Sequence, residues 1–342
     1  MKTNHIGIDL HKRTQTWVAL SEDGQSKLFT RTFPVTPEGV RAGVCLAQSI
    51  GSEKLVVAIE PVCGWMWVVA LLREAGFEVH ISNPRKVKAI ADSLQKTDEN
   101  DAHTLALLSR TGLMYESIEV SPEMQKLRSL VRERSFFIRT RASMKCRFEG
   151  VVTRSGRHLI PGSLTTQKGT ERIIASGEQE WKRSLESIAD MSTYIKELDA
   201  EVARHAKAPV PTLLMSIPGV GPVTAVSIWA EVGDFSRFSS ADKLCAFAGL
   251  VPTERSSGGV QRLGHITRAG STILRYILVE AAMRIRDTGK STVLCAFYKT
   301  VKEKRGAMRA RVALARKMLS VSWYLVKHGE RYAQRFPNQS KV

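Results

Sequence analysis

Residues 5–33 of the chain read HIGIDLHKRTQTWVALSEDGQSKLFTRTF. This stretch contains three short runs of apolar or alternating residues, and turn-forming residues separate them at HKRT and at EDG. Consecutive strands joined by such short turns pair with their neighbours in an antiparallel meander. We therefore expect three antiparallel strands at the start of the fold.

The next segments alternate between helical and strand patterns. Residues 36–50 have helical spacing, and residues 54–60 (KLVVAIE) form a β-branched run of the kind that is buried at a sheet centre. A helix is expected from about Trp65 to Ala75, a fifth strand over 77–83, and a further helical region from Pro84. The order β-β-β-α-β-α-β-α predicts an α/β domain of the RNase H-like (RuvC-like) type over residues 1–118.

Two long helical segments follow this domain. The first spans about 121–152 and is amphipathic and basic, and the second spans about 178–207 with mixed charges. They predict a connector over 119–208 in which the helices pair as an antiparallel or an intermolecular coiled coil, a common means of dimerisation. Pro209 and Pro211 end it, and residues 209–342 are expected to form a mainly α-helical C-terminal domain.

Composition limits the class of protein. The chain has 342 residues, of which 43% are hydrophobic and 25% are charged, as in folded soluble proteins. No apolar run approaches the roughly 20 residues that cross a bilayer, and the N-terminal residues lack the apolar core of a signal peptide. We expect a cytoplasmic, nucleoid-associated protein without a membrane partner. The five cysteines lack a CxxC pair and are interpreted as reduced packing residues.

The net charge of +18 is distributed unevenly along the sequence. Residues 1–105 contain 12 Lys and Arg against 12 Asp and Glu, whereas residues 251–342 contain 19 against 5. Such a surplus attracts polyanions through the release of condensed counterions. Nucleic acid is therefore the expected partner, and a solvated basic surface or an anionic membrane is the weaker alternative.

Acidic residues stand at the ends of the expected elements. Asp9 ends the first strand, and Glu60 ends the fourth. In an RNase H-like sheet these two strands are parallel neighbours, so their carboxylates would meet at one edge. Asp98 and Asp101 share one face of a helix through their three-residue spacing, whereas Glu99 points away and is expected to face solvent.

Four converging carboxylates are expected to hold hard divalent cations through oxygen ligands. Mg²⁺ is the default ion and Mn²⁺ the alternative, and two ions would support in-line displacement at phosphorus. Each acid alone is explained as well by a helix cap or a turn; Thr97, for example, is placed to cap the helix that contains Asp98. The joint placement of the acids is what favours a metal site.

An ordered set of motifs carries a resemblance that spans nearly the whole chain: GIDLHK, AIEP, KTDENDAH, GVGPVTA and PTERSSGGVQRLGHITRAGSTILR. The set resembles the DEDD transposases of insertion-sequence family one hundred and ten. This resemblance implies a metal-binding tetrad of Asp9, Glu60, Asp98 and Asp101, and a nucleophilic serine in the C-terminal domain. It maps that serine to Ser257, with Ser256 as the fallback. It also implies an element-encoded bridge RNA that pairs with donor and target DNA.

A serine hydroxyl needs activation by a base, a metal or cationic surroundings. Gly258 and Gly259 would allow close approach of a phosphate, and His265 is a candidate proton carrier. The cations expected to neutralise the scissile phosphate are Arg255, Arg262 and Arg268. In an unrelated chain, SSGG would be interpreted as a flexible loop.

Several other segments are expected to contact nucleic acid. SIPGVGPVTA (216–225) resembles a helix-hairpin-helix turn, in which Gly219 and Gly221 would expose backbone N–H groups to a phosphate. A glycine-rich turn between packed helices is the structural alternative. The final helical run, about 298–327, is expected to pack on one face and to bind nucleic acid on the other. Candidate cations in these helices and in the connector are Lys304, Arg305, Arg309, Arg134 and Arg141.

Three functions are compatible with these features. The first is a recombinase that acts through a serine–phosphate intermediate, in a dimer or tetramer whose acidic and serine sites come together on assembly. A RuvC-like nuclease would use the same acids with water as the nucleophile, and an assembly factor would bind nucleic acid without catalysis. A covalent DNA–protein adduct would distinguish the recombinase from the nuclease. Asp9→Asn or Glu60→Gln should leave recombination unchanged if the protein is only an assembly factor.

Overall fold

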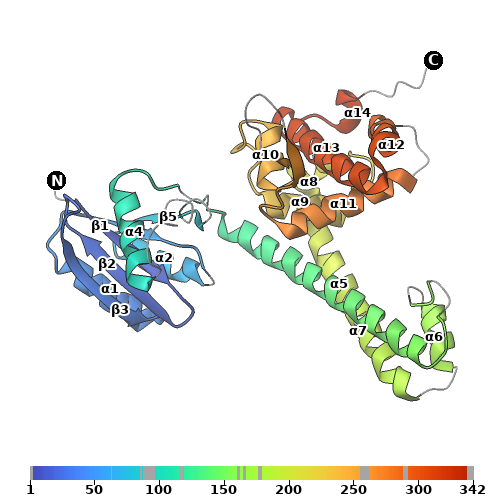
Figure 1. Cartoon of the computed structure of the whole chain (residues 1–342), viewed down its shortest axis with the longest axis horizontal. Coiled ribbons are helices and arrows are strands. Elements are labelled where there is room, and N and C mark those ends of the chain that lie inside the picture. The colour runs from blue at the N-terminus through green and yellow to red at the C-terminus, as the bar shows by residue number, and fades with distance from the viewer. Residues whose placement is uncertain are drawn as a thin grey trace. The chain divides into compact units, whose positions relative to one another are not determined.

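The computed structural model describes residues 3–62, 64–84, 87, 97–115, 117, 119–159, 162–164, 167–175, 179–254, 262–287 and 292–336. The chain forms two compact units, residues 1–119 and 120–342 (Figure 1).

The first unit contains a five-stranded sheet in the order β3-β2-β1-β4-β5. The strands are β1 (Thr3–Leu10), β2 (Thr14–Leu20), β3 (Lys27–Pro34), β4 (Lys54–Ile59) and β5 (Glu78–Ile81). β2 pairs antiparallel with both β1 and β3, whereas β4 pairs parallel with both β1 and β5. The expected meander and the parallel contact between the first and fourth strands are both confirmed.

Helices cover both faces of this sheet. Ile6, Ile8 and Leu10 of β1 pack with α1 (Pro37–Gln48) and α2 (Trp65–Glu74) in one apolar core. On the other face, α4 (Asp98–Arg110) packs its small residues Ala102 and Ala106 against β2. Most of the helical region expected from Pro84 lies outside the described residues.

The second unit starts with a helical hairpin built from α5 (Pro122–Arg154), α6 (Gln167–Ala175) and α7 (Gln179–Arg204). α5 and α7 lie side by side and run antiparallel, because Arg134 pairs with Asp199 while Phe148 packs against Trp181. The two long helices therefore pair within one chain. Leu127 and Val131 of α5 and Val202 of α7 join the C-terminal core, so the base of the hairpin is anchored there.

The rest of the second unit is mainly helical, in agreement with expectation. Its elements are η1 (His205–Lys207), α8 (Pro209–Leu214), α9 (Pro222–Val232), α10 (Ala241–Phe247), β6 (Pro252–Glu254), β7 (Leu263–Ile266), α11 (Thr272–Asp287), α12 (Val293–Arg305), α13 (Ala307–His328) and α14 (Tyr332–Arg335). β6 and β7 pair antiparallel and were not predicted. The final helical run expected over about 298–327 is helical, but Gly306 at φ 82° divides it into α12 and α13.

The cysteines differ in their exposure to solvent. Cys45 and Cys146 are exposed, so their interpretation as packing residues is wrong; Cys245 is buried and Cys295 is partly buried. Cys63 lies outside the described residues. In the part of the chain that the structure describes, no helix is both long enough and apolar enough to cross a lipid bilayer.

Candidate functional site

The register of the central strands brings Asp9 and Glu60 to the same end of the sheet. β1 and β4 are parallel, and Ile8 is aligned with Ile59. The next residue on each strand is an acid, Asp9 on β1 and Glu60 just after β4. The two carboxylates therefore leave the sheet side by side, as the sequence predicted.

Close packing of α4 on β1 places the helical acids above this edge. Side chains two residues apart on a strand share a face, so Gly7 and Asp9 both face α4. A Cβ at Gly7 would lie 1.8 Å from the backbone oxygen of Ala102. Only a residue without a side chain permits this approach, which sets the height of α4 over the sheet.

The first turn of α4 presents its acids in two directions. Thr97 caps the helix by accepting a hydrogen bond from the Asn100 N–H, as predicted. Asp98 and Asp101 lie in this turn, where carboxylates favour the positive end of the helix dipole. Glu99 instead forms an exposed ion pair with Lys27 and takes no part in the cluster.

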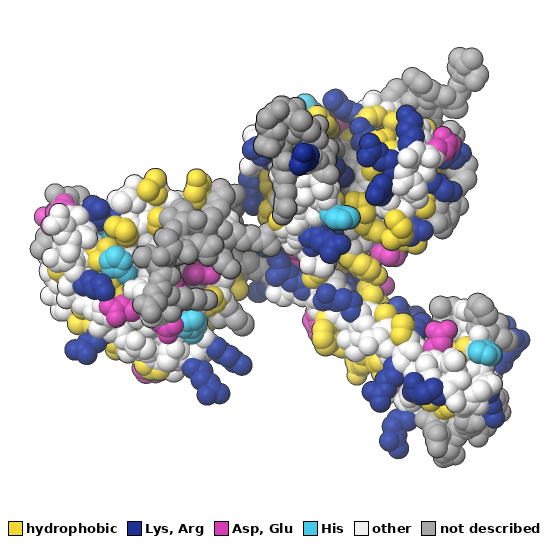
Figure 2. Space-filling view, viewed as in Figure 1, with side chains coloured by type: hydrophobic (Ala, Val, Ile, Leu, Met, Phe, Trp, Pro, Cys, Tyr) yellow, Lys and Arg dark blue, Asp and Glu magenta, His cyan; other side chains and the backbone are white. Residues whose placement is uncertain are grey.

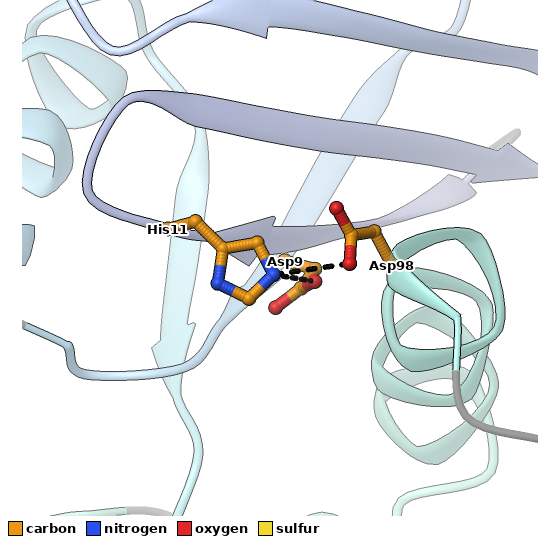
Figure 3. A group of neighbouring side chains, drawn as sticks. All are labelled: Asp9, His11 and Asp98. Carbon is orange, nitrogen blue, oxygen red and sulfur yellow. Dashed lines mark hydrogen bonds and ion pairs between the residues drawn. The ribbon is translucent and has the colours of Figure 1, made fainter.

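A histidine links the two groups of acids (Figure 3). His11 Nε2 lies 3.1 Å from Asp9 Oδ2 and 3.1 Å from Asp98 Oδ1. The first contact lacks hydrogen-bond geometry, and Asp9 Oδ2 is buried without a hydrogen-bond partner among the described residues. His11 and Asp98 are about half exposed, so the cluster opens to solvent on that side.

The acids of the cluster influence the charge states of Asp9 and His11. Burial raises the pKa of Asp9 to about 6, the nearby charge of His11 opposes this rise, and the carboxylates of Asp98, Asp101 and Glu60 add to it. Burial alone would lower the pKa of His11, but Asp9, Asp98 and Asp101 together raise it. The site is a partly exposed anionic cluster that attracts positive charge.

The residues present fit a divalent cation. Asp9, His11 and Asp98 each offer one ligand atom, and these atoms all lie within 4.8 Å of one another. Asp9 Oδ2 is buried and has no hydrogen-bond partner among the described residues, and such an oxygen is one that an ion would satisfy. Glu60 and Asp101 act on Asp9 electrostatically and stand outside this closest group.

Sequence reasoning missed His11. The segment HKRT was interpreted only as a turn between two strands. One signal was available, because His11 follows Asp9 by two residues, and continuing the strand alternation places both side chains on the face of α4. A carboxylate and an imidazole at this spacing form a plausible pair of ligands in any chain.

The predicted serine site is only partly described. Ser256, Ser257, Gly258, Gly259 and Arg255 lie outside the described residues, in the sequence between β6 and β7. On either side of these residues in the sequence, β6 and β7 are joined by Thr253, which donates a hydrogen bond to the backbone oxygen of His265. Arg262 stands just before β7, and Arg268 follows it.

Arg268 has an unusual backbone conformation. Its φ is 53°, and it is the sole non-glycine residue with positive φ in the described part of the chain. Two glycines allow close backbone contacts beside this turn: a Cβ at Gly249 would lie 2.0 Å from the oxygen of Ala269, and a Cβ at Gly270 would lie 1.8 Å from the oxygen of Phe247. A side chain held in a costly conformation beside a candidate site is consistent with a functional requirement.

The other predicted nucleic-acid contacts are spread over the second unit. Arg134 pairs with Asp199, and Arg141 donates a hydrogen bond to Ser192, so both stabilise the hairpin. Lys304 and Arg305 lie in the last turn of α12, and Arg309 lies on α13. Figure 2 shows Lys and Arg side chains on the hairpin and on the C-terminal helices.

The two glycines of the GVG turn differ in their roles. Gly219 has φ of 80°, and a Cβ there would lie 2.7 Å from the Ile285 side chain. Gly221 has ordinary extended backbone and occupies the N-cap position of α9 without a capping side chain, and a Cβ there would meet no atom within 4 Å. Gly219 is therefore needed for the turn between α8 and α9, whereas Gly221 leaves open space in front of α9.

Comparison with family models identifies relatives of both units. A model described as "Transposase IS116/IS110/IS902 family" matches residues 211–299. A second model, for DEDD transposases of the IS110 type and described as "Transposase", matches residues 6–156. The second match includes all four predicted acids, and the first includes the predicted serine.

Curated relatives cover most of the chain. A "Probable family 20 transposase" of Pseudomonas aeruginosa is 29% identical, over 75% of this chain and 79% of its own length. The "Transposase for insertion sequence element IS1111A" of Coxiella burnetii is 29% identical, over 83% of this chain and 81% of its own length. A "Pilin gene-inverting protein" of Moraxella bovis is 26% identical, over 75% of each.

One solved structure also matches. T. thermophilus RuvC in complex with a Holliday junction substrate aligns with 34% of this chain and 99% of its own, at a TM-score of 0.27 and 16% sequence identity.

Proposed function

The chain belongs to the IS110 family of transposases, and from that premise we propose that it is a DNA recombinase that excises and integrates an insertion sequence. It would join donor and target DNA by strand exchange through a serine–phosphate intermediate. Acid-bound Mg²⁺, in two ions, would assist the reaction, with Mn²⁺ as a substitute. Relatives named as transposases and as a gene-inverting protein support recombination as the class of reaction.

The carboxylate cluster carries this proposal. Asp9 is buried, its Oδ2 has no hydrogen-bond partner among the described residues, and the charges of Glu60, Asp98 and Asp101 act on it. Such a concentration of charge is unfavourable in the protein alone and becomes favourable when divalent ions are bound. A bound ion would supply Lewis-acid stabilisation of the charge that develops on phosphate oxygens.

Ser257 would provide the nucleophile. Its Oγ attacks the scissile phosphorus and forms a phosphoserine ester to the 5′ end, while the bond to the 3′ oxygen breaks and that oxygen leaves as a hydroxyl. The 3′ hydroxyl of the partner strand then attacks the same phosphorus and releases the serine. The number of phosphoester bonds is conserved, so strand exchange needs no external energy source. Arg255, Arg262 and Arg268 would neutralise the phosphate, and His265 would carry the serine proton.

We propose further that target choice depends on a structured bridge RNA. Base pairing would then read sequence, while the protein holds backbone phosphates with cations that have no base preference. The basic helical unit offers such cations, including Lys304, Arg305 and Arg309. Sequencing the nucleic acid that co-purifies with the protein tests this part directly.

Trapping the intermediate tests the reaction itself. A nicked or suicide DNA substrate should leave DNA covalently attached to the wild-type chain, and Ser257→Ala should abolish the adduct while Ser256→Ala retains it. The opposite result would assign the nucleophile to Ser256. Products cut without any adduct would instead show a nuclease that uses water. Asp9→Asn should abolish cleavage, and full recombination by that variant would show that the acidic cluster is not catalytic.

A further inference from the structure

The helical unit contains a cavity that the proposed chemistry does not use. Its volume is about 270 Å³, and it lies where the base of the hairpin meets the start of α9 and the middle of α11. Arg134 of α5 and Asp199 of α7 form one wall, and Tyr276 of α11 forms another. α9 contributes Gly221 and Ser227. All of these residues belong to one compact unit, so the cavity is an intrinsic feature of it.

The N-terminus of α9 opens into this cavity without a cap. Gly221 is the N-cap residue and, within the described residues, no side chain caps the helix. Pro222 has no N–H, so the free donors of the first turn are those of Val223 and Thr224, which also line the cavity. Uncapped N–H groups and the helix dipole together favour an anion such as a phosphate.

Ser227 supplies a second, independent observation. It is 1% exposed, and its hydroxyl has no hydrogen-bond partner among the described residues. Other helical serines avoid this cost by donating to the carbonyl four residues earlier, as Ser135 does to Val131 and Ser322 does to Met318. An unpaired buried hydroxyl is unfavourable, so Ser227 is placed to bond a group that enters the cavity.

The remaining lining favours a flat, polar ring. Tyr276 is 45% exposed, although it lines the cavity, and Ile138 and Ile277 add apolar surface. Arg134 and Arg284 are balanced by Asp199 and Glu280, so the cavity offers both donors and acceptors. A site for the polyanionic backbone alone would be one-sidedly basic. A nucleobase, by contrast, combines an aromatic face with an edge of donors and acceptors.

We propose that this cavity binds one unpaired nucleotide of a nucleic-acid strand. Its phosphate would accept hydrogen bonds from the start of α9, its base would lie against Tyr276, and Ser227 would bond the base edge or the sugar. The volume lies just below the usual range for small-molecule sites, so the cavity has room for no more than one nucleotide. The choice of nucleic acid as the ligand rests on the proposed function.

The base contact is tested with the full chain and a single-stranded hexanucleotide that contains one 2-aminopurine. Fluorescence should change on binding, because stacking alters the emission of 2-aminopurine. Tyr276→Ala should weaken binding of this probe by about 10-fold, whereas Tyr276→Phe, which keeps the ring, should bind as the wild type does. A blunt duplex of the same length should be insensitive to either change. Equal binding by the Ala and Phe variants would overturn the proposal.

The phosphate contact is tested at Gly221. A side chain there meets open space, and both Asp and Asn cap helices well, so Gly221→Asp and Gly221→Asn should melt at or above the wild-type temperature. Asn occupies the α9 donors, and Asp also repels the phosphate. We expect the Asp variant to bind the hexanucleotide at least 10-fold more weakly than the Asn variant. Equal affinities of the Asp variant and the wild type would exclude a phosphate at this helix end.

Both tests are carried out in the Asp9→Asn background with EDTA, where no strand cleavage takes place. Specific binding of the probe would then support the cavity even if the strand-transfer assay fails. Conversely, suppose that the wild type recombines DNA while substitutions at Tyr276 and Gly221 leave probe binding unchanged. That result would contradict the proposed nucleotide site and leave the proposed function standing.

Discussion

Asp9 combines deep burial with neighbouring negative charge, and the two effects act in the same direction. Its pKa is raised to about 6 from an ordinary value of 3.8. A raised pKa in the folded state means that the protonated acid stabilises the fold below about pH 4. This contribution is lost as the pH rises through about 6. At neutral pH without metal, Asp9 therefore lowers the free energy of unfolding.

Asp9→Asn should stabilise the metal-free protein at pH 7.5. Removing the buried charge is expected to raise the free energy of unfolding by up to about 3 kcal/mol, which is the free energy equivalent of the pKa rise. The same variant should lose the stabilisation that Mg²⁺ gives to the wild type. Thermal melting in EDTA and in Mg²⁺, at pH 5 and at pH 7.5, measures both effects, and the gain in EDTA should shrink at pH 5.

Glu99→Gln is the matched control for this change. Glu99 lies in the same helical turn as Asp98, but its carboxylate faces Lys27 in an exposed pair. Such pairs contribute less than about 1 kcal/mol, so melting and its Mg²⁺ response should both stay near wild type. An Mg²⁺ response that survives in Asp9→Asn but disappears in Glu99→Gln would place the ion elsewhere.

At this scale the sequence was informative about the acids and uninformative about their partner. Asp9 and Glu60 were found because strand ends can be recognised from apolar runs, and parallel neighbours bring such ends together. His11 was missed because the residues after a strand were interpreted only by their turn propensity. The distances that join it to Asp9 and Asp98 depend on how α4 packs, and a pattern in one strand carries no such information.

Among the elements, the position of α4 is the one most tightly limited by its packing against the sheet. It must lie close enough to β1 for Asp98 to approach Asp9, and Gly7 provides the room. Gly7→Ala would drive a Cβ into the Ala102 backbone, so α4 must move away from the sheet. We expect a loss of about 1–3 kcal/mol in the free energy of unfolding, as for other overpacked sites, and a weaker Mg²⁺ response. Urea unfolding and the Mg²⁺ dependence of melting measure these changes.

Gly150→Ala tests whether the loss is specific to Gly7. Gly150 lies within α5, and a Cβ there would meet nothing closer than 3.5 Å, the Arg154 side chain. Alanine should therefore stabilise this helix by about 0.5–1 kcal/mol. If Gly7→Ala were equally benign, α4 would not depend on the glycine for its position.

The elements themselves could be predicted where they are long or regular. Clear patterns of apolar residues predicted the three-stranded meander, the buried fourth strand and the two hairpin helices. β6 and β7 escaped prediction because strands of three and four residues are too short to show alternation. The break at Gly306 escaped because the flanking residues continue the same helical spacing, and only the backbone conformation reveals that the chain turns there.

For the whole molecule, charge divides along the same boundary as the fold. Residues 1–119 contain 13 Lys and Arg against 14 Asp and Glu, and residues 120–342 contain 38 against 19. Non-specific binding to DNA should therefore come from the second unit. The affinity of a fragment 120–342 for random duplex should fall with salt on the same logarithmic slope as that of the full chain. Fluorescence anisotropy at roughly 50 to 200 mM salt measures this slope. If the slope of the fragment were half that of the full chain, cations from residues 1–119 would have to take part in binding.

The separate locations of the acids and the serine in the sequence leave a question of assembly. Asp9, Glu60, Asp98 and Asp101 belong to the first unit, and Ser257 belongs to the second. The proposed reaction needs both, and the composite site that we expect on assembly of an oligomer would supply them from different copies. Asp9→Asn and Ser257→Ala should each be inactive alone. Mixed together, they should recover a fraction of wild-type strand exchange, because one copy contributes intact acids and the other an intact serine.

A mixture of Asp9→Asn with Glu60→Gln is the control, since no copy then has a complete acidic cluster. If the mixture of Asp9→Asn and Ser257→Ala stayed inactive, a composite site shared between copies would be contradicted. Equal recovery in the control would show that the acidic cluster does not act as one unit.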